Sequence, residues 1–344
     1  MKCLDLFCGC GGMSLGFQTA GFEIVAAIDN WREAIDVYQA NFSHDAIELD
    51  LTNEEETLKI LKKYAPDMIV GGPPCQDFSS AGKRDITLGR ADLTYNYANI
   101  VCKYQPSWFV MENVDRITKS HILRDVTDQF IKNKYGLTAV ILDASYCNVP
   151  QARTRFFLIG HLNGKNNELL NIFKRRLSKY PMTIRDYLGD ELGLQYYYRH
   201  PRNYNRRGIF SIDEPSPTIR GVNRPIPSGY KKNSCDPKDA NLDEIRPLTT
   251  IERSYIQTFP KSFLFKGTKT NLEQIIGNSV PVNLGKFVAE TIKDFLENGV
   301  DKGGILPLFD FEEDFIIPDA PLKNPLYSLS STMTKKRKLE GLKV

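Results

Sequence analysis

The sequence lacks any run of apolar residues that approaches the roughly 20 needed for a membrane-spanning helix. It also lacks a clean signal peptide, because Asp5 falls inside the segment that would have to be apolar. Both absences argue against secretion and against a membrane anchor. We therefore expect a cytoplasmic protein with no membrane partner.

Cysteine and histidine offer neither a disulfide framework nor a metal site. The seven Cys residues are odd in number and irregularly spaced over a long chain, which is not the pattern of a secreted disulfide scaffold. Cys8 and Cys10 have no further Cys or His at the spacing of zinc ligands, and the four His residues are scattered. We expect reduced thiols and no bound metal.

No sign of charge dominates the chain as a whole. The 45 Lys and Arg residues against 42 Asp and Glu give a net charge of +3, which neither requires nor excludes a nucleic-acid partner. With 41% hydrophobic and 25% charged residues, the composition supports a sizeable core and argues against a disordered chain. The length of 344 residues predicts about two domains.

Short apolar runs separated by amphipathic helical segments organise the first 160 residues. These runs cover residues 2–7, 22–28, 67–70, 108–111 and 156–160. The alternation predicts an α/β fold in which helices cover both faces of a parallel sheet. Polar motifs follow several runs, and ligands of open α/β sheets bind outside the carboxyl ends of the strands.

The segment from residue 165 to 232 differs in charge from the rest of the chain. It holds fourteen Lys and Arg residues and six acids, so it carries +8 and leaves −5 for the remainder. Tyr residues at 196–198 and 204 lie among the basic residues, which suggests a nucleic-acid surface. A solvated face of a second domain fits the charge equally well. Beyond residue 299 the chain is Pro-rich, and we expect a poorly ordered tail or at most a docked strand.

A glycine-rich turn, DLFCGCGG at residues 5–12, follows the first apolar run. Its glycines let the backbone approach a ligand closely, although a tight strand-to-helix connection would need them too. Ser14 replaces the third Gly of a dinucleotide fingerprint, so a nicotinamide site is disfavoured. Asp29 ends the second run and could accept from ribose hydroxyls. Asp50 could accept from an adenine amino group while Leu51 packs on the ring, but such acids are often helix caps.

The segment GGPPCQDFS, residues 71–79, presents Cys75 directly after two prolines. A nucleophilic thiolate needs an exposed and rigidly aimed Cys, and these turn residues argue against the usual buried position of a lone Cys. Residues 79–92 are rich in Gly, Ser and charge, as expected of a loop that closes over a substrate.

Three further motifs carry polar groups near predicted strands. Glu112 ends the run at 108–111, where a carboxyl group in a cleft could keep its proton. In an extended segment Gln151, Arg153 and Arg155 share one face, although surface ion pairs would produce the same triplet. QIIGNSVP, residues 274–281, opens the last helix with cap or ligand-contact residues.

The order DLFCGCGG, GGPPCQDFS, ENV, QARTR and QIIGNSVP resembles the motif order of DNA cytosine-5 methyltransferases of the bacterial restriction-modification type. The likeness spans about residues 1 to 298. It implies a Rossmann-like S-adenosylmethionine-dependent methyltransferase fold with a mostly parallel sheet and a smaller target-recognition domain. The corresponding boundaries are 1–162 plus 272–298 for the catalytic and cofactor-binding domain, 163–271 for recognition and 299–344 for the tail.

The resemblance also implies roles for individual residues. Cys75 falls at the nucleophile, Glu112 and Arg155 fall at residues that hold the cytosine, and Arg153 joins them in the catalytic set. S-adenosyl-L-methionine is the implied methyl donor. Its expected contacts are Phe7, Gly9, Cys10, Gly11, Gly12, Asp29, Asn30, Asp50, Leu51, Pro74, Leu93, Asn278, Ser279 and Val280. Asp29 stands where the family more often has Glu, which shortens the reach to the ribose.

Double-stranded DNA is the implied partner, bound by a monomer that shares its site with a cognate restriction endonuclease. The expected DNA contacts are Ser79, Lys83, Arg84, Thr218, Arg220 and Arg224. Arg220 and Arg224 flank Gly221, just after Thr218-Ile219, a pair that resembles the Thr-plus-aliphatic pair inside the family's recognition domain. An RNA cytosine methyltransferase of the same fold and an inactive DNA-binding relative remain alternatives, though the intact Cys75 and Glu112 disfavour the latter.

Overall fold

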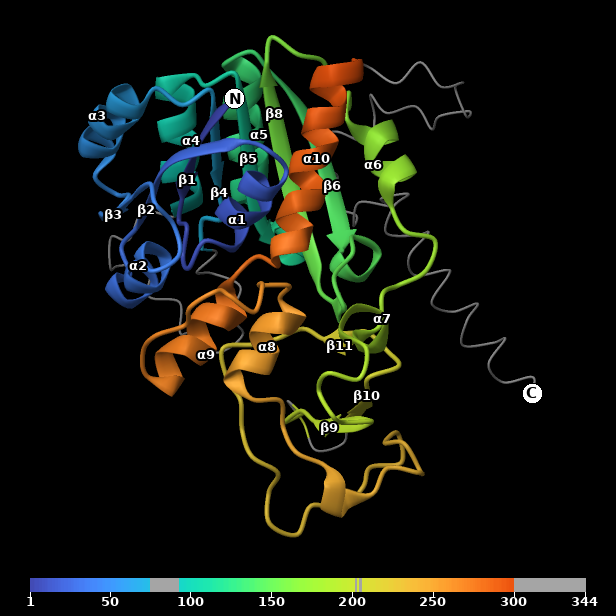
Figure 1. Cartoon of the computed structure of the whole chain (residues 1–344). Coiled ribbons are helices and arrows are strands. Elements are labelled where there is room, and N and C mark those ends of the chain that lie inside the picture. Colours follow the sequence, from blue (N-terminus) through green and yellow to red (C-terminus); the bar gives the residue numbers. More distant parts are fainter. Residues whose placement is uncertain (75–92, 202, 204–205, 300–344) are drawn as a thin grey trace.

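A seven-stranded sheet forms the larger part of the computed structural model, which describes residues 1–74, 93–201, 203 and 206–299. The strand order is β3-β2-β1-β4-β5-β8-β6 (Figure 1). The bounds are β1 Lys2–Leu6, β2 Glu23–Asp29, β3 Asp45–Glu48, β4 Met68–Gly71, β5 Trp108–Val114, β6 Tyr135–Asp143 and β8 Thr154–Leu162. The order reverses direction between β1 and β4, where doubly wound sheets bind ligands.

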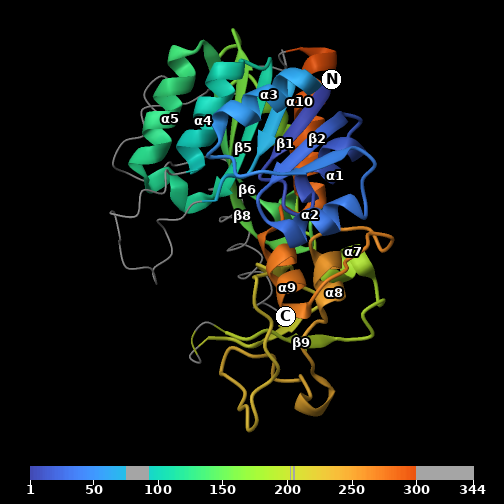
Figure 2. The ribbon, with the colours of Figure 1, turned by 90° about the vertical axis from the view of Figure 1, so that its left-hand side faces the viewer.

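Helices cover both faces of this sheet, as the alternation of apolar runs predicts. One face packs against α1 (Gly12–Thr19), α6 (Leu170–Arg176) and α10 (Val282–Asn298). The other packs against α3 (Glu54–Tyr64), α4 (Leu93–Tyr104) and α5 (His121–Lys132). Figure 2 shows these two layers on opposite sides of the strands. The helix α2 (Arg32–Gln39) connects β2 to β3. The α/β class is therefore confirmed.

One strand departs from the parallel arrangement. The run at 156–160 lies in β8, which is antiparallel to both of its neighbours, β5 and β6. A parallel return requires a crossover of about a dozen or more residues, usually a helix, whereas β6 and β8 are joined by a short 3-10 turn at Ala144–Tyr146 and the two-residue strand β7 (Gln151–Ala152). The reversal brings the first residues of β8 to the edge where the parallel strands end.

A smaller region lies beyond that edge, below the sheet in Figure 1. It contains short elements only: α7 Ile184–Leu188, β9 Tyr196–Tyr198, β10 Ile209–Ser211, β11 Ser216–Pro217, a 3-10 turn Leu242–Glu244, α8 Thr250–Ile256 and α9 Lys269–Asn278. β11 pairs in parallel with β7, so this region is joined directly to the start of β8. We call residues 184–278 the recognition region, after the target-recognition role that the sequence resemblance leads us to expect for residues 163–271.

The last helix returns to the sheet and packs closely on α1. A Cβ atom on Gly16 would lie 2.6 Å from both the Val282 carbonyl oxygen and the Lys286 nitrogen, so the two helix backbones touch there. In the part of the chain that the structure describes, no helix has the length and apolar character needed to cross a membrane.

Candidate active site

The carboxyl ends of β2, β1, β4 and β5 meet at one edge of the sheet. Side by side along this edge lie Asp29 at the end of β2, Phe7 after β1, Pro73 after β4 and Glu112 in β5. The antiparallel strand β8 begins at the same edge and adds Arg155. Phe7 has a φ of 60°, in the left-handed region that a bulky side chain rarely adopts. Strained backbone of this kind gathers at functional sites.

Glu112 and Arg155 form an ion pair within this edge. Arg155 Nε lies 2.8 Å from Glu112 Oε1, and the side chains are only 14% and 12% exposed. Burial raises the pKa of Glu112 above its ordinary value, while the positive charges of Arg155 and Arg153 act in the opposite direction. A carboxyl group held this way can keep or share a proton near neutral pH.

The chain leaving β4 is held against Glu112. A Cβ on Gly72 would lie 3.0 Å from Glu112 Oε2, so a larger residue would crowd the carboxylate and require it to shift slightly. Asn113 Nδ2 donates to the Pro73 carbonyl oxygen at 3.0 Å, which fixes the segment before the exposed Pro74. Cys75 is the next residue in the sequence; it lies outside the described residues, as do Ser79, Lys83 and Arg84.

The glycine-rich turn is tied to the end of β2 through Asp29. Its carboxylate accepts from the Gly9 nitrogen at 2.8 Å and from the Trp31 nitrogen at 2.9 Å. Burial raises the pKa of Asp29, although these backbone donors oppose the rise. A Cβ on Gly9 would meet nothing within 4 Å, so the turn is open on that side, next to the exposed Asn30.

The start of α1 is closed on the opposite side by the segment before α10. A Cβ on Gly12 would lie 2.2 Å from the Val280 carbonyl oxygen and 2.3 Å from Ser279 Oγ, so no larger residue fits. Cys10 is buried beside Ser279, and Gly11 is buried against Phe42 and Tyr38. Asn278 is exposed and accepts from Gln274 Nε2 at 2.8 Å. The motif at 274–281 therefore returns to the glycine-rich turn, as the sequence resemblance implies.

Asp50 and Leu51 lie in the loop after β3. Asp50 is exposed and accepts from the Thr52 nitrogen at 2.9 Å, which makes a local turn rather than a helix cap; Asn53 is the residue that caps α3. Leu51 is 2% exposed and belongs to the core under α3 and α4. Leu93, the first residue of α4, is half-buried.

A cleft of about 980 Å³ separates this edge from the recognition region. It is lined by two acids, Asp115 and Glu214, and by a larger set of arginines from both sides. These are Arg116, Arg153, Arg155, Arg199, Arg206, Arg207 and Arg220. A concave wall with such an excess of positive charge attracts a polyanion.

Comparisons with known proteins agree with this geometry. The family model of C-5 cytosine-specific DNA methylase matches residues 1–294. The chain belongs to this family. The Type II methyltransferase M.HindV of Haemophilus influenzae is 70% identical over 295 residues, which cover 86% of this chain and 97% of that protein. M.HgiDI of Herpetosiphon aurantiacus, also a Type II methyltransferase, is 54% identical over 90% of this chain and all of its own length.

The crystal structure of the S. pombe Dnmt2 methyltransferase has the same fold. It superposes with a TM-score of 0.63 at 19% identity and covers 86% of this chain and 98% of its own. The expected methyltransferase fold, with its mostly parallel sheet, is therefore confirmed, and the protein is a DNA cytosine-5-methyltransferase.

Within this methyltransferase, Arg153 occupies a different setting from Arg155. It is 1% exposed and donates to three backbone carbonyl oxygens: Ile219 at 3.1 Å, Gly277 at 3.2 Å and Ser279 at 3.1 Å. These contacts join β8 to the recognition region and to the segment beside the glycine-rich turn. They favour a positioning role over the catalytic role that the sequence suggests.

The residues expected to contact DNA lie on the recognition side. Thr218 lines the cleft and its hydroxyl donates to the Ala152 carbonyl oxygen at 3.0 Å. Arg220 also lines the cleft, but its guanidinium donates to the His200 carbonyl oxygen. Arg224 is exposed. The pKa of His200 is lowered mainly by burial and further by the positive charges of Arg224 and Arg220.

Sequence reasoning missed several buried polar residues. Gln257 is fully buried; it accepts from Gln151 Nε2 at 2.7 Å and donates to the carbonyl oxygens of Ile276 and Ser279. Asp5 is buried below the turn and accepts from Ser14 Oγ at 2.6 Å. The position of Asp5 inside the motif could have identified it, whereas no local signal marks Gln257.

Proposed function

We propose that the enzyme transfers a methyl group from S-adenosyl-L-methionine to carbon 5 of a cytosine flipped out of a specific duplex DNA sequence, through a covalent bond to Cys75. The observation that carries this proposal is the buried Glu112–Arg155 pair beside the segment that leads into Cys75. A base inside a duplex is out of reach of such a pocket, so the nucleotide must leave the stack.

Cys75 supplies the nucleophile in this reaction. Its thiolate adds to carbon 6, and the electron pair released toward carbon 5 lets that carbon attack the methyl group. S-adenosyl-L-methionine supplies the methyl group as a substrate and leaves as the thioether. The proton on carbon 5 then departs to a base, and the bond between carbon 6 and the Cys75 sulfur breaks to release 5-methylcytosine.

Glu112 and Arg155 hold the ring during these steps. With its pKa raised by burial, Glu112 can present a proton to ring nitrogen 3 while its other oxygen accepts from the exocyclic amine. Arg155 binds the ring carbonyl oxygen with nitrogens that its 2.8 Å contact to Glu112 leaves available. The pair thereby stabilises negative charge that thiolate addition would otherwise leave on the ring.

The residues of the glycine-rich turn fit the adenosyl donor. The open side of Gly9 admits a ligand against the backbone, and Asp29 has lone pairs left for ribose hydroxyls. We also assign contacts with the methyl donor to a set of residues around this turn: Phe7, Asn30, Asp50, Leu51, Pro74, Leu93 and the Asn278–Val280 segment. Because Leu51 is deeply buried, only the small exposed part of its side chain can contact an adenine ring.

Duplex DNA is the acceptor: the positive charge of the cleft suits a polyanion, and the DNA methylase family and the Type II relatives favour DNA over RNA. Thr218, Arg220 and Arg224 contact it from the recognition side, and Ser79, Lys83 and Arg84 from the segment after Cys75. Because the most similar relatives described above are Type II methyltransferases, we propose that the enzyme acts in the cytoplasm as a monomer and protects DNA from a cognate restriction endonuclease.

Transfer of a labelled methyl group tests this function. The purified enzyme should label duplex DNA but not RNA of the same sequence, and sequencing should place 5-methylcytosine at one position of a recurring site. Cys75→Ser should lose the transfer and keep affinity for S-adenosyl-L-methionine. Labelling of RNA alone, or of adenine, would contradict the proposal.

A further inference from the structure

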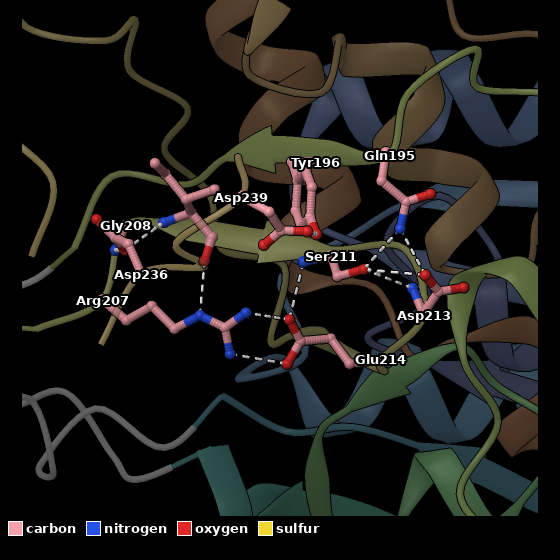
Figure 3. A network of polar contacts seen from close by, with 10 residues as sticks. Gln195, Tyr196, Arg207, Gly208, Ser211, Asp213, Glu214, Asp236 and Asp239 are labelled. Carbon is pink, nitrogen blue, oxygen red and sulfur yellow. Dashed lines mark hydrogen bonds and ion pairs between the residues drawn. The ribbon is translucent and has the colours of Figure 1, made fainter. Parts of the chain in front are cut away.

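Two carboxylates organise the part of the recognition region that borders the cleft. Glu214 and Asp236 both bind the chain around β10, whose antiparallel partner is β9. Figure 3 shows this polar network, in which the side chains converge on residues 207–211. Short strands alone would hold this segment weakly, so the carboxylates set its position.

Glu214 grips Arg207 with both oxygens. Arg207 Nη1 donates to Glu214 Oε2 at 2.8 Å, Nη2 donates to Oε1, and Nε donates to the Ile209 carbonyl oxygen at 2.6 Å. The guanidinium also lies 4.5 Å from the centre of the Phe210 ring. Glu214 accepts in addition from the Ser211 nitrogen at 2.8 Å, so one carboxylate fixes both ends of β10 (Figure 3).

Asp236 secures the same segment from the other side. It is 6% exposed and accepts from the backbone nitrogens of Gly208 and Ile209, at 2.9 and 3.0 Å. The Tyr230 hydroxyl and the Asn233 nitrogen donate to its second oxygen at 2.7 and 2.8 Å. Rigid backbone on both sides of Gly208 is the result.

Arg206 immediately precedes this fixed segment and lines the cleft. Its side chain is exposed, and among the described residues no carboxylate forms an ion pair with it. Arg207 differs, because its donors are engaged by Glu214 and Ile209. The fixed segment anchors the Arg206 backbone at the wall of the cleft, while its guanidinium is not engaged by a described carboxylate and so keeps its donors for a base edge.

Glu214 also links this segment to the catalytic edge. Ser216 and Pro217, two and three residues later, form β11, which pairs with Gln151 and Ala152 of β7. Arg153 and Arg155 follow directly in the chain. The Arg207–Glu214 pair therefore sets the placement of Arg206 relative to the pocket that receives the cytosine.

We propose that Arg206 is a specificity-determining residue that recognises a guanine in the target site, and that Glu214 is the positioning residue that holds it in place. The inference rests on the proposed function, since it requires DNA in the cleft. An arginine that donates to guanine O6 and N7 in the major groove is the commonest base-specific contact in protein–DNA complexes.

The test uses the full-length enzyme and a duplex library randomised around the methylated cytosine. Arg206→Ala should lower the preference for guanine at one position by roughly 10–100-fold and leave the preference at the other positions intact. Arg206→Lys should recover part of that preference, because lysine can reach guanine but lacks the fork. The Arg206 side chain is exposed and forms no ion pair with a described residue, and its backbone contact to Asn203 does not depend on the side chain, so these variants should fold.

Glu214→Gln should relax preference at that same position by a smaller factor. It keeps an acceptor for the Ser211 nitrogen but loses the charge that pairs with Arg207. The matched control is Glu252→Gln, because Glu252 holds Arg246 with two contacts of 2.7 Å in the same region and neither residue lines the cleft. This control should keep the wild-type site preference.

Two outcomes would overturn the inference. If Arg206→Ala slows methylation of all sequences equally and reduces the salt dependence of binding, Arg206 is a phosphate contact and not a reader. If Glu214→Gln and Glu252→Gln have the same site preference as the wild type, Glu214 has no positioning role. Absence of methylation by the wild-type enzyme would instead refute the proposed function itself.

Discussion

Two buried carboxyl groups show how differently the catalytic edge and the recognition region are built. Asp5, in β1, is 1% exposed and, among the described residues, accepts from Ser14 alone, through the hydroxyl and the backbone nitrogen; burial raises its pKa to about 7. Asp236, in the recognition region, is similarly buried, and burial alone would raise its pKa. Its four donors outweigh that effect and lower the pKa below the ordinary value.

The difference reflects what holds each region together. Around Asp5, strand pairing and apolar side chains determine every position, and a carboxyl group must fit into them. Around Asp236, strands are three residues long, and ionised carboxylates supply the acceptors that position the loops. The catalytic edge therefore tolerates little change in packing, whereas the recognition region depends on charge.

The largest effect should come from the pair at the catalytic edge. Glu112→Gln should lower the rate of methyl transfer by roughly 10²–10³, because the amide cannot supply a proton to the ring and leaves Arg155 without its counter-charge. Single-turnover kinetics measure the rate, and calorimetry with S-adenosyl-L-methionine should show unchanged affinity. A loss of less than about tenfold would be inconsistent with a role for Glu112 in holding the ring.

Arg153 spans the two regions and should matter for stability. Arg153→Met keeps much of the volume but removes three hydrogen bonds: the carbonyl oxygens of Ile219 and Gly277 lose their donor, and that of Ser279 keeps only Gln257. At about 1 kcal/mol for each hydrogen bond, the free energy of unfolding should fall by about 3 kcal/mol. Denaturant titration checks this value. Wild-type stability combined with a complete loss of methyl transfer would show that Arg153 is catalytic instead.

Asp236→Asn should loosen the recognition region alone. The amide offers one acceptor oxygen in place of two, so two of the four donors lose their partner, and unfolding at neutral pH should require roughly 1–3 kcal/mol less. Because the folded pKa of Asp236 is lowered, its contribution is present above the unfolded pKa and is lost as pH falls through the folded pKa. As the pH falls, the free energy of unfolding of the wild type should therefore decrease more steeply than that of the variant. Equal slopes for the two proteins in acid would argue against an ionised Asp236.

Asp5 should produce the opposite dependence on pH. Its folded pKa is raised, so between about pH 4 and 7 the unfolded chain ionises Asp5 while the folded protein keeps it protonated. Stability should therefore fall as pH rises through this window, by about 1 kcal/mol per pH unit. Asp5→Asn should flatten this slope in unfolding titrations at pH 5, 6 and 7, with Ser14→Ala as the control that keeps Asp5 ionisable.

Motif order was sufficient to predict the catalytic edge. A polar motif after an apolar run becomes a side chain at the end of a strand, which is how Asp29 and Glu112 come together along one edge. The return of the 274–281 motif to the glycine-rich turn was expected from the family resemblance and not from the local pattern. The antiparallel direction of β8 could not be predicted in this way, since it depends on a short connection rather than on apolar periodicity.

The recognition region was far less predictable. Contacts such as Arg153 to Ser279 and Asp236 to Gly208 join residues far apart in the chain or in loops without a periodic pattern. Arg220, expected from the sequence to contact DNA, donates to the His200 carbonyl oxygen, whereas Arg206 borders a segment held by two carboxylates. Both arginines line the cleft, but how far the protein itself engages each guanidinium depends on long-range partners, which local sequence does not encode.

Covalent trapping tests the central claim most directly. A duplex with 5-fluorocytosine at the target cytosine should form a complex with the enzyme and S-adenosyl-L-methionine that survives denaturation, because fluorine cannot leave carbon 5 as a proton does. Peptide mapping should place the adduct on Cys75, and Cys75→Ser should form none. An adduct on another cysteine, or methyl transfer by Cys75→Ser at the wild-type rate, would contradict the account.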